Sequence, residues 1–214
     1  ISDTAQAPGS KINGKFSSTR CHMGGFSLNY HKHINTGEGG ILITNYKKFY
    51  LKAAFIRNHA EALQKKNCSK EDLVNMVGYN FRMNEVEAAI GIEQLKKLNK
   101  ILIKRVKTAK KIINGIKDLK GLITVDLSEV KDFSNVFYLL PLKIDPTKIK
   151  VSRKKIIGYL KSTGLTGLIE GYSIIHKLPI FQKKIAFGNK GYPWNLTNKK
   201  INYKKGICPV AEEL

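Results

Sequence analysis

Hydrophobic and polar positions alternate at helical spacing through the middle of the chain. Two sets of apolar residues recur three or four positions apart: Ala88, Ile92, Leu95 and Leu98, then Leu102, Val106, Ala109, Ile113 and Ile116. This spacing predicts two helices that pack against each other or connect to a second domain, the later one stopping near Gly121. Asn84 with Glu87 predicts an N-cap and capping box at the first helix.

Shorter apolar runs predict strands and a helix before these two helices. The runs at 24–28 and 41–44 predict strands, and the second, bounded by glycines and Asn45, predicts a buried one. Apolar positions at helical spacing predict a helix over 46–58, and a polar loop is predicted over 62–72. This part of the chain has the pattern of an α/β domain.

The pattern changes from about residue 121. The runs at 122–125 and 136–144 predict strands, the second tolerating Pro141 only at an edge or a bulge. A third helix around residues 156–160 is predicted to end at Gly164, and 165–214 has the composition of loops. The pattern therefore predicts an α/β domain followed by a smaller α+β domain.

The composition limits the binding partners and the cell compartment expected for this chain. Its 214 residues include 38 Lys and Arg against 16 Asp and Glu, for a net charge of +22, but only five of the basic residues are Arg. Lysines that alternate with Ile and Leu are typical of solvated helix faces, so nucleic-acid binding is not favoured; a basic, non-enzymatic protein that binds polyanions is an alternative. Three scattered cysteines and the lack of a membrane span or signal favour a cytoplasmic protein.

Lys32 differs in its surroundings from the other lysines. It lies between His31 and His33, ahead of a glycine-rich turn and between two short apolar runs. A lysine held against strand ends can be desolvated, and its neutral amine is then a Schiff-base nucleophile. Asp3 follows a predicted strand and could pair with a pyridinium nitrogen, while Ser27 could donate its hydroxyl to a phosphate. An isolated pair of histidines does not make a metal site.

Four segments in this order carry a family resemblance. They are Asp3-Thr4-Ala5-Gln6-Ala7, the segment 26–40, Arg57-Asn58-His59 and Gly78-Tyr79-Asn80-Phe81-Arg82-Met83. They resemble the DegT/DnrJ/StrS-type sugar aminotransferases, which are fold-type I enzymes dependent on pyridoxal 5'-phosphate. The resemblance implies that residues 1–98 are the remainder of the large cofactor-binding domain, 99–120 a connecting helix and 121–214 an incomplete small domain. It also implies that the large domain's N-terminal part and the extreme C-terminus are missing.

The resemblance assigns roles to five residues. Lys32 would form the Schiff base with the cofactor and move the proton during catalysis. Asp3 would pair with the pyridine nitrogen, Gln6 would lie beside the ring, and Ser27 would bind the phosphate. Asn80 would reach the phosphate of a neighbouring subunit's cofactor, which implies a homodimer.

The implied reaction transfers an amino group, with glutamate as the expected donor, to a keto-sugar attached to a nucleotide. Tyr172 and His176 are candidate sugar-binding residues. Some family members are dehydratases with histidine in place of the lysine, but the spacing from Lys32 to the glycines at 37–40 favours transamination. A catalytically inert fragment is the second alternative.

Overall fold

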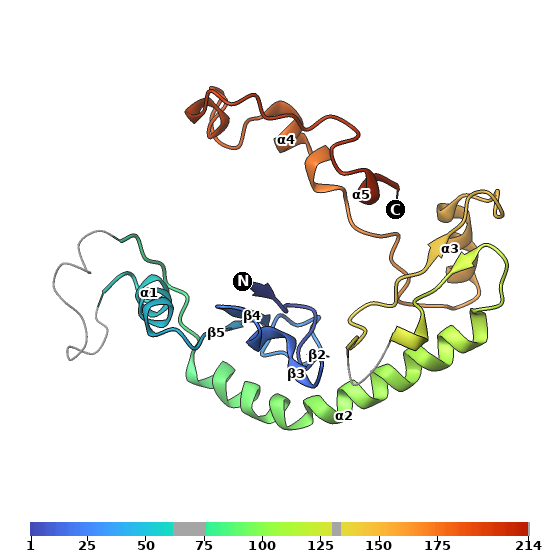
Figure 1. The fold of residues 1–214 in the computed structure, drawn as a ribbon, viewed down its shortest axis with the longest axis horizontal. Helices are drawn as coiled ribbons and strands as arrows, with labels where there is room; N and C mark the ends of the chain where they lie inside the picture. Colours follow the sequence, from blue (N-terminus) through green and yellow to red (C-terminus); the bar gives the residue numbers. More distant parts are fainter. Residues whose placement is uncertain (62–75, 130–133, 214) are drawn as a thin grey trace. The chain divides into compact units, whose positions relative to one another are not determined.

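The computed structural model describes residues 1–61, 76–129 and 134–213 (Figure 1). The chain divides into two compact units. The first contains Ile1–Leu119 and Thr124–Leu142, and the second contains Lys120–Ile123 and Lys143–Leu214. The predicted loop over 62–72 lies outside the described residues. No described helix has the length and apolar character that crossing a membrane requires.

A three-stranded sheet organises the first unit. Its order is β1 (Ser2–Asp3), β4 (Gly24–Ser27) and β5 (Gly40–Ile43), with β1 parallel and β5 antiparallel to the central β4. A hairpin of β2 (Lys11–Ile12) and β3 (Lys15–Phe16) precedes β4. The hairpin turns through Asn13 and Gly14, both at positive φ, the dipeptide that suits a tight two-residue turn.

The prediction that 41–44 is a buried strand is wrong about burial. β5 forms as an outer strand of the sheet, but the side chains of Ile41 and Leu42 are 46% and 51% exposed. An apolar run on a strand indicates a surface that gains free energy when covered, but it does not specify what covers it.

A single long helix replaces the two predicted ones. The helix α1 (Lys47–Arg57) appears as expected, but α2 runs without a break over Glu85–Ile116. The residues between the two apolar sets are Asn99, Lys100 and Ile101, so neither proline nor glycine is present to end a helix. The N-terminus of α2 confirms the predicted capping box: Asn84 Oδ1 accepts from the Glu87 N–H, and Glu87 Oε2 accepts from the Asn84 N–H.

The predicted strand over 136–144 is also wrong for most of its length. Only Lys143–Ile144 (β7) is extended, and it pairs with β6 (Leu122–Ile123) in the second unit. Val136 and Phe137 are instead buried in the first unit, where Phe137 packs against Ala109 and Ile113 of α2. Hydrophobic packing on α2 therefore outweighs the strand preference of this apolar run.

The second unit has short elements joined by long connections. After β6 and β7 it contains α3 (Arg153–Ser162), α4 (Pro179–Lys183) and α5 (Pro209–Glu213). The third predicted helix is confirmed as α3, and Gly164 follows it at φ +88°. Phe181, Trp194 and Tyr203 pack their rings together, with centroids 5.3 to 6.3 Å apart.

Candidate active site

Strand register brings three of the candidate residues to one edge of the sheet. Asp3 ends β1 and pairs with Gly25, so Ser27 lies just beyond that pair at the end of the parallel strand β4. The antiparallel β5 begins with Gly40 opposite Ser27. The loop of residues 28–39, which carries Lys32, therefore leaves and re-enters the sheet at the edge where Asp3 and Ser27 lie.

This loop, called the Lys32 loop from here on, is closed at its base by hydrogen bonds. The Leu28 N–H donates to Gly39 O at 2.9 Å, and the Thr36 N–H donates to Leu28 O at 3.0 Å. Across the loop, Asn29 Nδ2 donates to Glu38 Oε1 at 2.7 Å. These bonds, together with the buried side chain of Ile34, give the loop a defined conformation.

The polar groups at the sheet edge keep capacity for a ligand. Asp3 is exposed, and its Oδ1 accepts from the Ala5 N–H at 3.0 Å. Ser27 Oγ accepts from the Asn29 N–H at 3.3 Å, and no described residue accepts the Ser27 hydroxyl proton. Gln6 is exposed. A carboxylate and a hydroxyl donor are thus available at this edge.

Lys32 itself is half-buried and faces an aromatic ring. Its Nζ lies 4.6 Å from the ring centroid of Tyr138, close enough for a cation–π contact. Among the described residues, none of the ion pairs with an Asp or Glu involves Lys32. The amine is therefore held by a contact that does not tie it to a carboxylate.

The two histidines beside Lys32 have different environments. His31 is exposed, and its ring centroid lies 3.7 Å from that of Tyr30. His33 is buried, and its Nε2 donates to Val136 O at 3.1 Å. Burial lowers the pKa of His33 below 6.5; the bond to Val136 opposes this shift, and the charges of Arg105 and Lys32 add to it. His33 is therefore held in its neutral form.

Asn80 lies outside the sheet edge. It forms an isolated bridge with Asn58, and its side-chain oxygen accepts from the Arg82 N–H at 3.5 Å. Arg82 also donates to Asn58 Oδ1 at 2.6 Å. Asn80 is exposed, so its amide can reach a group outside this chain.

The candidate sugar-binding residues belong to the second unit and differ in accessibility. Tyr172 is 71% exposed. His176 is only 8% exposed, and its Nε2 lies 2.9 Å from Glu212 Oε1. Its backbone oxygen accepts from Gln182 Nε2. The imidazole of His176 is therefore engaged within its own unit, whereas the Tyr172 ring is available for contacts.

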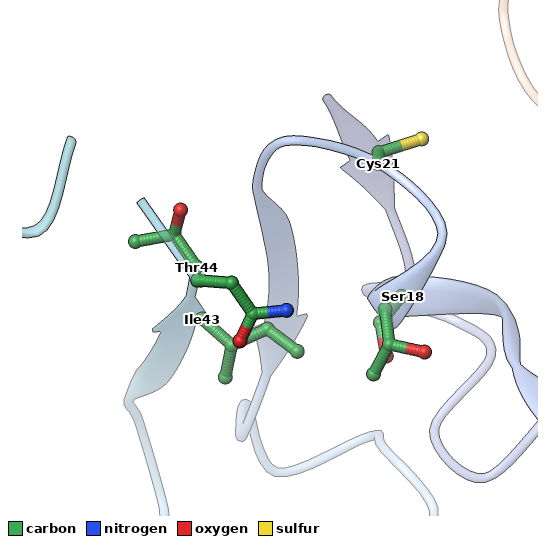
Figure 2. Close-up of a pocket in the computed structure, with 6 residues that line it drawn as sticks. Ser18, Cys21, Ile43 and Thr44 are labelled. Carbon is green, nitrogen blue, oxygen red and sulfur yellow. The ribbon is translucent and has the colours of Figure 1, made fainter. Parts of the chain in front are cut away.

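Figure 2 shows a hollow beside Ser18, Cys21, Ile43 and Thr44. It encloses about 300 Å³, including space open to solvent. The residues that line it are Ser18, Thr19, Cys21, Ile43, Thr44 and Asn45. Since Ile43 pairs with Gly24 at the amino end of β4, this hollow is separate from the groups at the carboxyl end.

Two residues that contact the site could not be singled out from the sequence. Tyr138 and Val136 touch the Lys32 loop from a segment more than a hundred positions later in the chain. No local pattern marks them. Arg105, which donates to the backbone of this segment, carried one weak signal: it is one of only five arginines in a lysine-rich chain.

Comparison with known proteins accounts for the order of the sequence motifs. Residues 1–198 match the DegT/DnrJ/EryC1/StrS aminotransferase family. The chain belongs to this family. Members of the family use pyridoxal phosphate and adopt the fold-type I architecture, so the predicted resemblance is confirmed.

Individual family members show the extent of the similarity. The chain is 27% identical to GDP-perosamine synthase of Escherichia coli O157:H7, over 86% of this chain and 47% of that protein. It is 37% identical to the UDP-4-amino-4,6-dideoxy-N-acetyl-beta-L-altrosamine transaminase of Campylobacter jejuni, over 49% of this chain and 27% of that protein. The structure of Helicobacter pylori PseC, an aminotransferase of pseudoaminic acid biosynthesis, matches with a TM-score of 0.72 and 25% identity, over 88% of this chain and 49% of PseC. The chain spans about half the length of several of the family members it matches.

Proposed function

We propose that this chain carries the lysine-bearing cofactor site of a sugar aminotransferase that transfers an amino group from glutamate to a nucleotide-linked keto-sugar. The observation that supports this most is the register of β1, β4 and β5, because it brings Asp3, Ser27 and the Lys32 loop to one sheet edge. Membership in a family of aminotransferases supplies the reaction class.

The groups at this edge suit pyridoxal phosphate chemically. The exposed Asp3 carboxylate can accept a hydrogen bond from a protonated ring nitrogen, and the Ser27 hydroxyl can donate to a phosphate oxygen. When bound, the cofactor supplies an electron sink that stabilises negative charge at the carbon that loses its proton. In this proposal Asp3 would support that chemistry by keeping the ring nitrogen protonated, and Gln6, from the same segment, would lie beside the ring.

Lys32 performs the proton transfer in this proposal. Its amine takes a proton from the carbon of the amino donor and returns it to the adjacent reacting carbon, acting first as a general base and then as a general acid. None of the ion pairs with Asp or Glu among the described residues involves Lys32, which supports this role because a carboxylate partner would hold the amine strongly in its charged form.

The remaining residues define the surroundings of the reaction. We infer that Asn80, exposed and outside the sheet edge, binds the cofactor phosphate of a second subunit in a homodimer. Tyr172, and with it His176, would contribute to the sugar site, with Tyr172 as the contacting side chain because it is exposed. The two described cysteines are free, in keeping with a cytoplasmic protein.

The matched variants Lys32→Ala and Lys97→Ala test the proposal. The full chain is incubated with pyridoxal phosphate, reduced with borohydride and digested, and the modified lysine is located by mass spectrometry. We expect a pyridoxyl group on Lys32 in the unaltered protein and in Lys97→Ala, no modification at that position in Lys32→Ala, and loss of transamination in Lys32→Ala alone. Equal transaminase activity in the two variants would refute the assignment.

A further inference from the structure

A short segment far along the chain lies against the Lys32 loop. The Tyr138 ring covers Lys32 Nζ, and Val136 O accepts from His33 Nε2. The rings of His33 and Tyr138 are also close, with centroids 5.9 Å apart. Two consecutive residues of the loop are thus held by one segment, called the 136–138 segment from here on.

Arg105 of α2 fixes the 136–138 segment in turn. Its Nε and Nη2 donate to Phe137 O at 3.1 and 2.9 Å, and its Nη2 also donates to Tyr138 O at 2.9 Å. Phe137 has a φ of +50°, which is unfavourable for a bulky residue, and its buried ring packs on α2. A conformation of this kind persists only where its surroundings enforce it, so the backbone that carries Tyr138 is held in a defined position.

We propose that Tyr138 is a positioning residue for the Lys32 amine and that Arg105 holds Tyr138 in place. The catalytic meaning of this inference rests on the proposed function. An aromatic face attracts an ammonium group without accepting its proton and without the strength of a buried ion pair. Tyr138 therefore fixes the position of the unattached amine and still allows it to leave for each proton transfer.

Substitutions of Tyr138 separate the effect of its aromatic face from the effect of its side-chain volume. Tyr138→Phe keeps the aromatic face and should behave like the unaltered protein. Tyr138→Leu keeps an apolar side chain but loses the face. Arg105→Lys keeps the charge but loses the forked donation to two carbonyl oxygens, so we expect an effect between these two.

The experiment measures the reactivity of the Lys32 amine without any cofactor. The full chain is treated with a trace of acetic anhydride at fixed pH, and the labelling of Lys32 is compared by mass spectrometry with that of Lys97 on the exposed side of α2. We expect the ratio to rise about two- to fivefold in Tyr138→Leu, the size of a cation–π contact, and to stay constant in Tyr138→Phe. The control Tyr159→Leu removes a tyrosine that is 70% exposed in the second unit, and it should leave the ratio unchanged.

An unchanged ratio in a folded Tyr138→Leu, or an equal rise in Tyr138→Phe, would overturn the proposal. If Tyr138→Leu fails to fold by circular dichroism, Tyr138→Met provides the same comparison with a more adaptable side chain. The outcome is separable from that of the proposed function. Pyridoxyl trapping at another lysine would remove the catalytic role and leave the labelling result intact, whereas a constant ratio with trapping at Lys32 would remove only the role of Tyr138.

Discussion

The two units each bury one histidine, and the two side chains have opposite electrostatic surroundings. His33 in the first unit is 7% exposed, bonds a carbonyl oxygen, and lies near the cations Lys32 and Arg105. His176 in the second unit is 8% exposed and faces the carboxylate of Glu212. The two histidines are therefore buried to the same extent but have different partners. His33 is neutral and bonds a carbonyl oxygen, whereas His176 lies beside the carboxylate of Glu212.

The difference indicates what each histidine does. His33 is a neutral donor that fastens the Lys32 loop to the 136–138 segment without adding a positive charge beside the amine. His176 is part of a cluster of polar contacts around Glu212, called the Glu212 cluster from here on. The carboxylate oxygens of Glu212 also accept from the N–H groups of Gly206 and Cys208. In the proposed function the first arrangement would serve the Lys32 amine, whereas the second fixes the chain before α5.

The largest difference in stability between the Lys32 loop and the segment before α5 is expected from substitutions of their glycines. Gly39 in the Lys32 loop has a φ of +146°, and a Cβ there would lie 2.8 Å from Thr36 Oγ1 and 3.1 Å from Met83 Cε. Gly206 also has a positive φ, +99°, but a Cβ there meets nothing within 4 Å. Gly39→Ala should lower the free energy of unfolding by about 2–4 kcal/mol, from strain plus overpacking, and Gly206→Ala by about 1 kcal/mol. Urea unfolding measures both, and equal losses would show that the loop relaxes around the added methyl group.

The sequence could predict which residues gather at the strand ends but not the contacts that the 136–138 segment makes with the Lys32 loop. Asp3 and Ser27 are recognisable because each is expected near the end of a strand, and Lys32 because it lies ahead of a glycine-rich turn between two short apolar runs. The capping box at Asn84 was predictable because it is local. The contacts of Lys32 with Tyr138 and of His33 with Val136 were not, because they depend on the path of the chain after α2. The same long-range packing explains why an apolar run at 136–140 is not a strand.

The second-largest loss of stability is expected when the Glu212 cluster in the second unit is disrupted. His176→Gln removes the imidazole that lies beside Glu212, and the loss of one partner of a buried polar pair costs about 1–3 kcal/mol. The matched control is His31→Gln, at an exposed position, where a change within about 0.5 kcal/mol is expected. Hydrogen exchange at the Gly206 and Cys208 amides should accelerate in His176→Gln alone. Unaltered exchange at both amides would mean that Glu212 holds this segment without the histidine.

Acidification should weaken the two regions at different pH values. The pKa of His33 is lowered by burial, so the unfolded chain binds the proton more readily; the stability that neutral His33 contributes is complete above pH 6.5 and is lost as the pH falls through its folded value. Desolvation raises the pKa of Glu212, but hydrogen bonds from Gly206 and Cys208, with Lys177 and His176, bring it below 4.5. The contribution of Glu212 is therefore lost only below pH 4.5.

Hydrogen exchange, corrected for its intrinsic pH dependence, measures this separation. Amides of the Lys32 loop should lose protection below pH 6.5, before those of Gly206 and Cys208 respond to Glu212. In His33→Gln the loop should lose this pH dependence, while the second unit is unaffected. Simultaneous loss of protection in both regions of the unaltered protein would contradict the assignment of separate titrating groups.

The smallest change in stability is expected at a solvent-exposed ion pair, which serves as the reference for the buried His176–Glu212 pair. Lys96 Nζ and Glu93 Oε1 form a pair one turn apart on α2, with side chains 66% and 60% exposed. Lys96→Gln should lower the free energy of unfolding by only about 0.2–0.5 kcal/mol, because water screens the charges and both side chains lose entropy in pairing. The loss should also shrink in 1 M salt, whereas that of His176→Gln should persist, because burial keeps mobile ions away from the His176–Glu212 pair. A loss at Lys96 as large as that at His176, or one independent of salt, would show that burial is not what separates them.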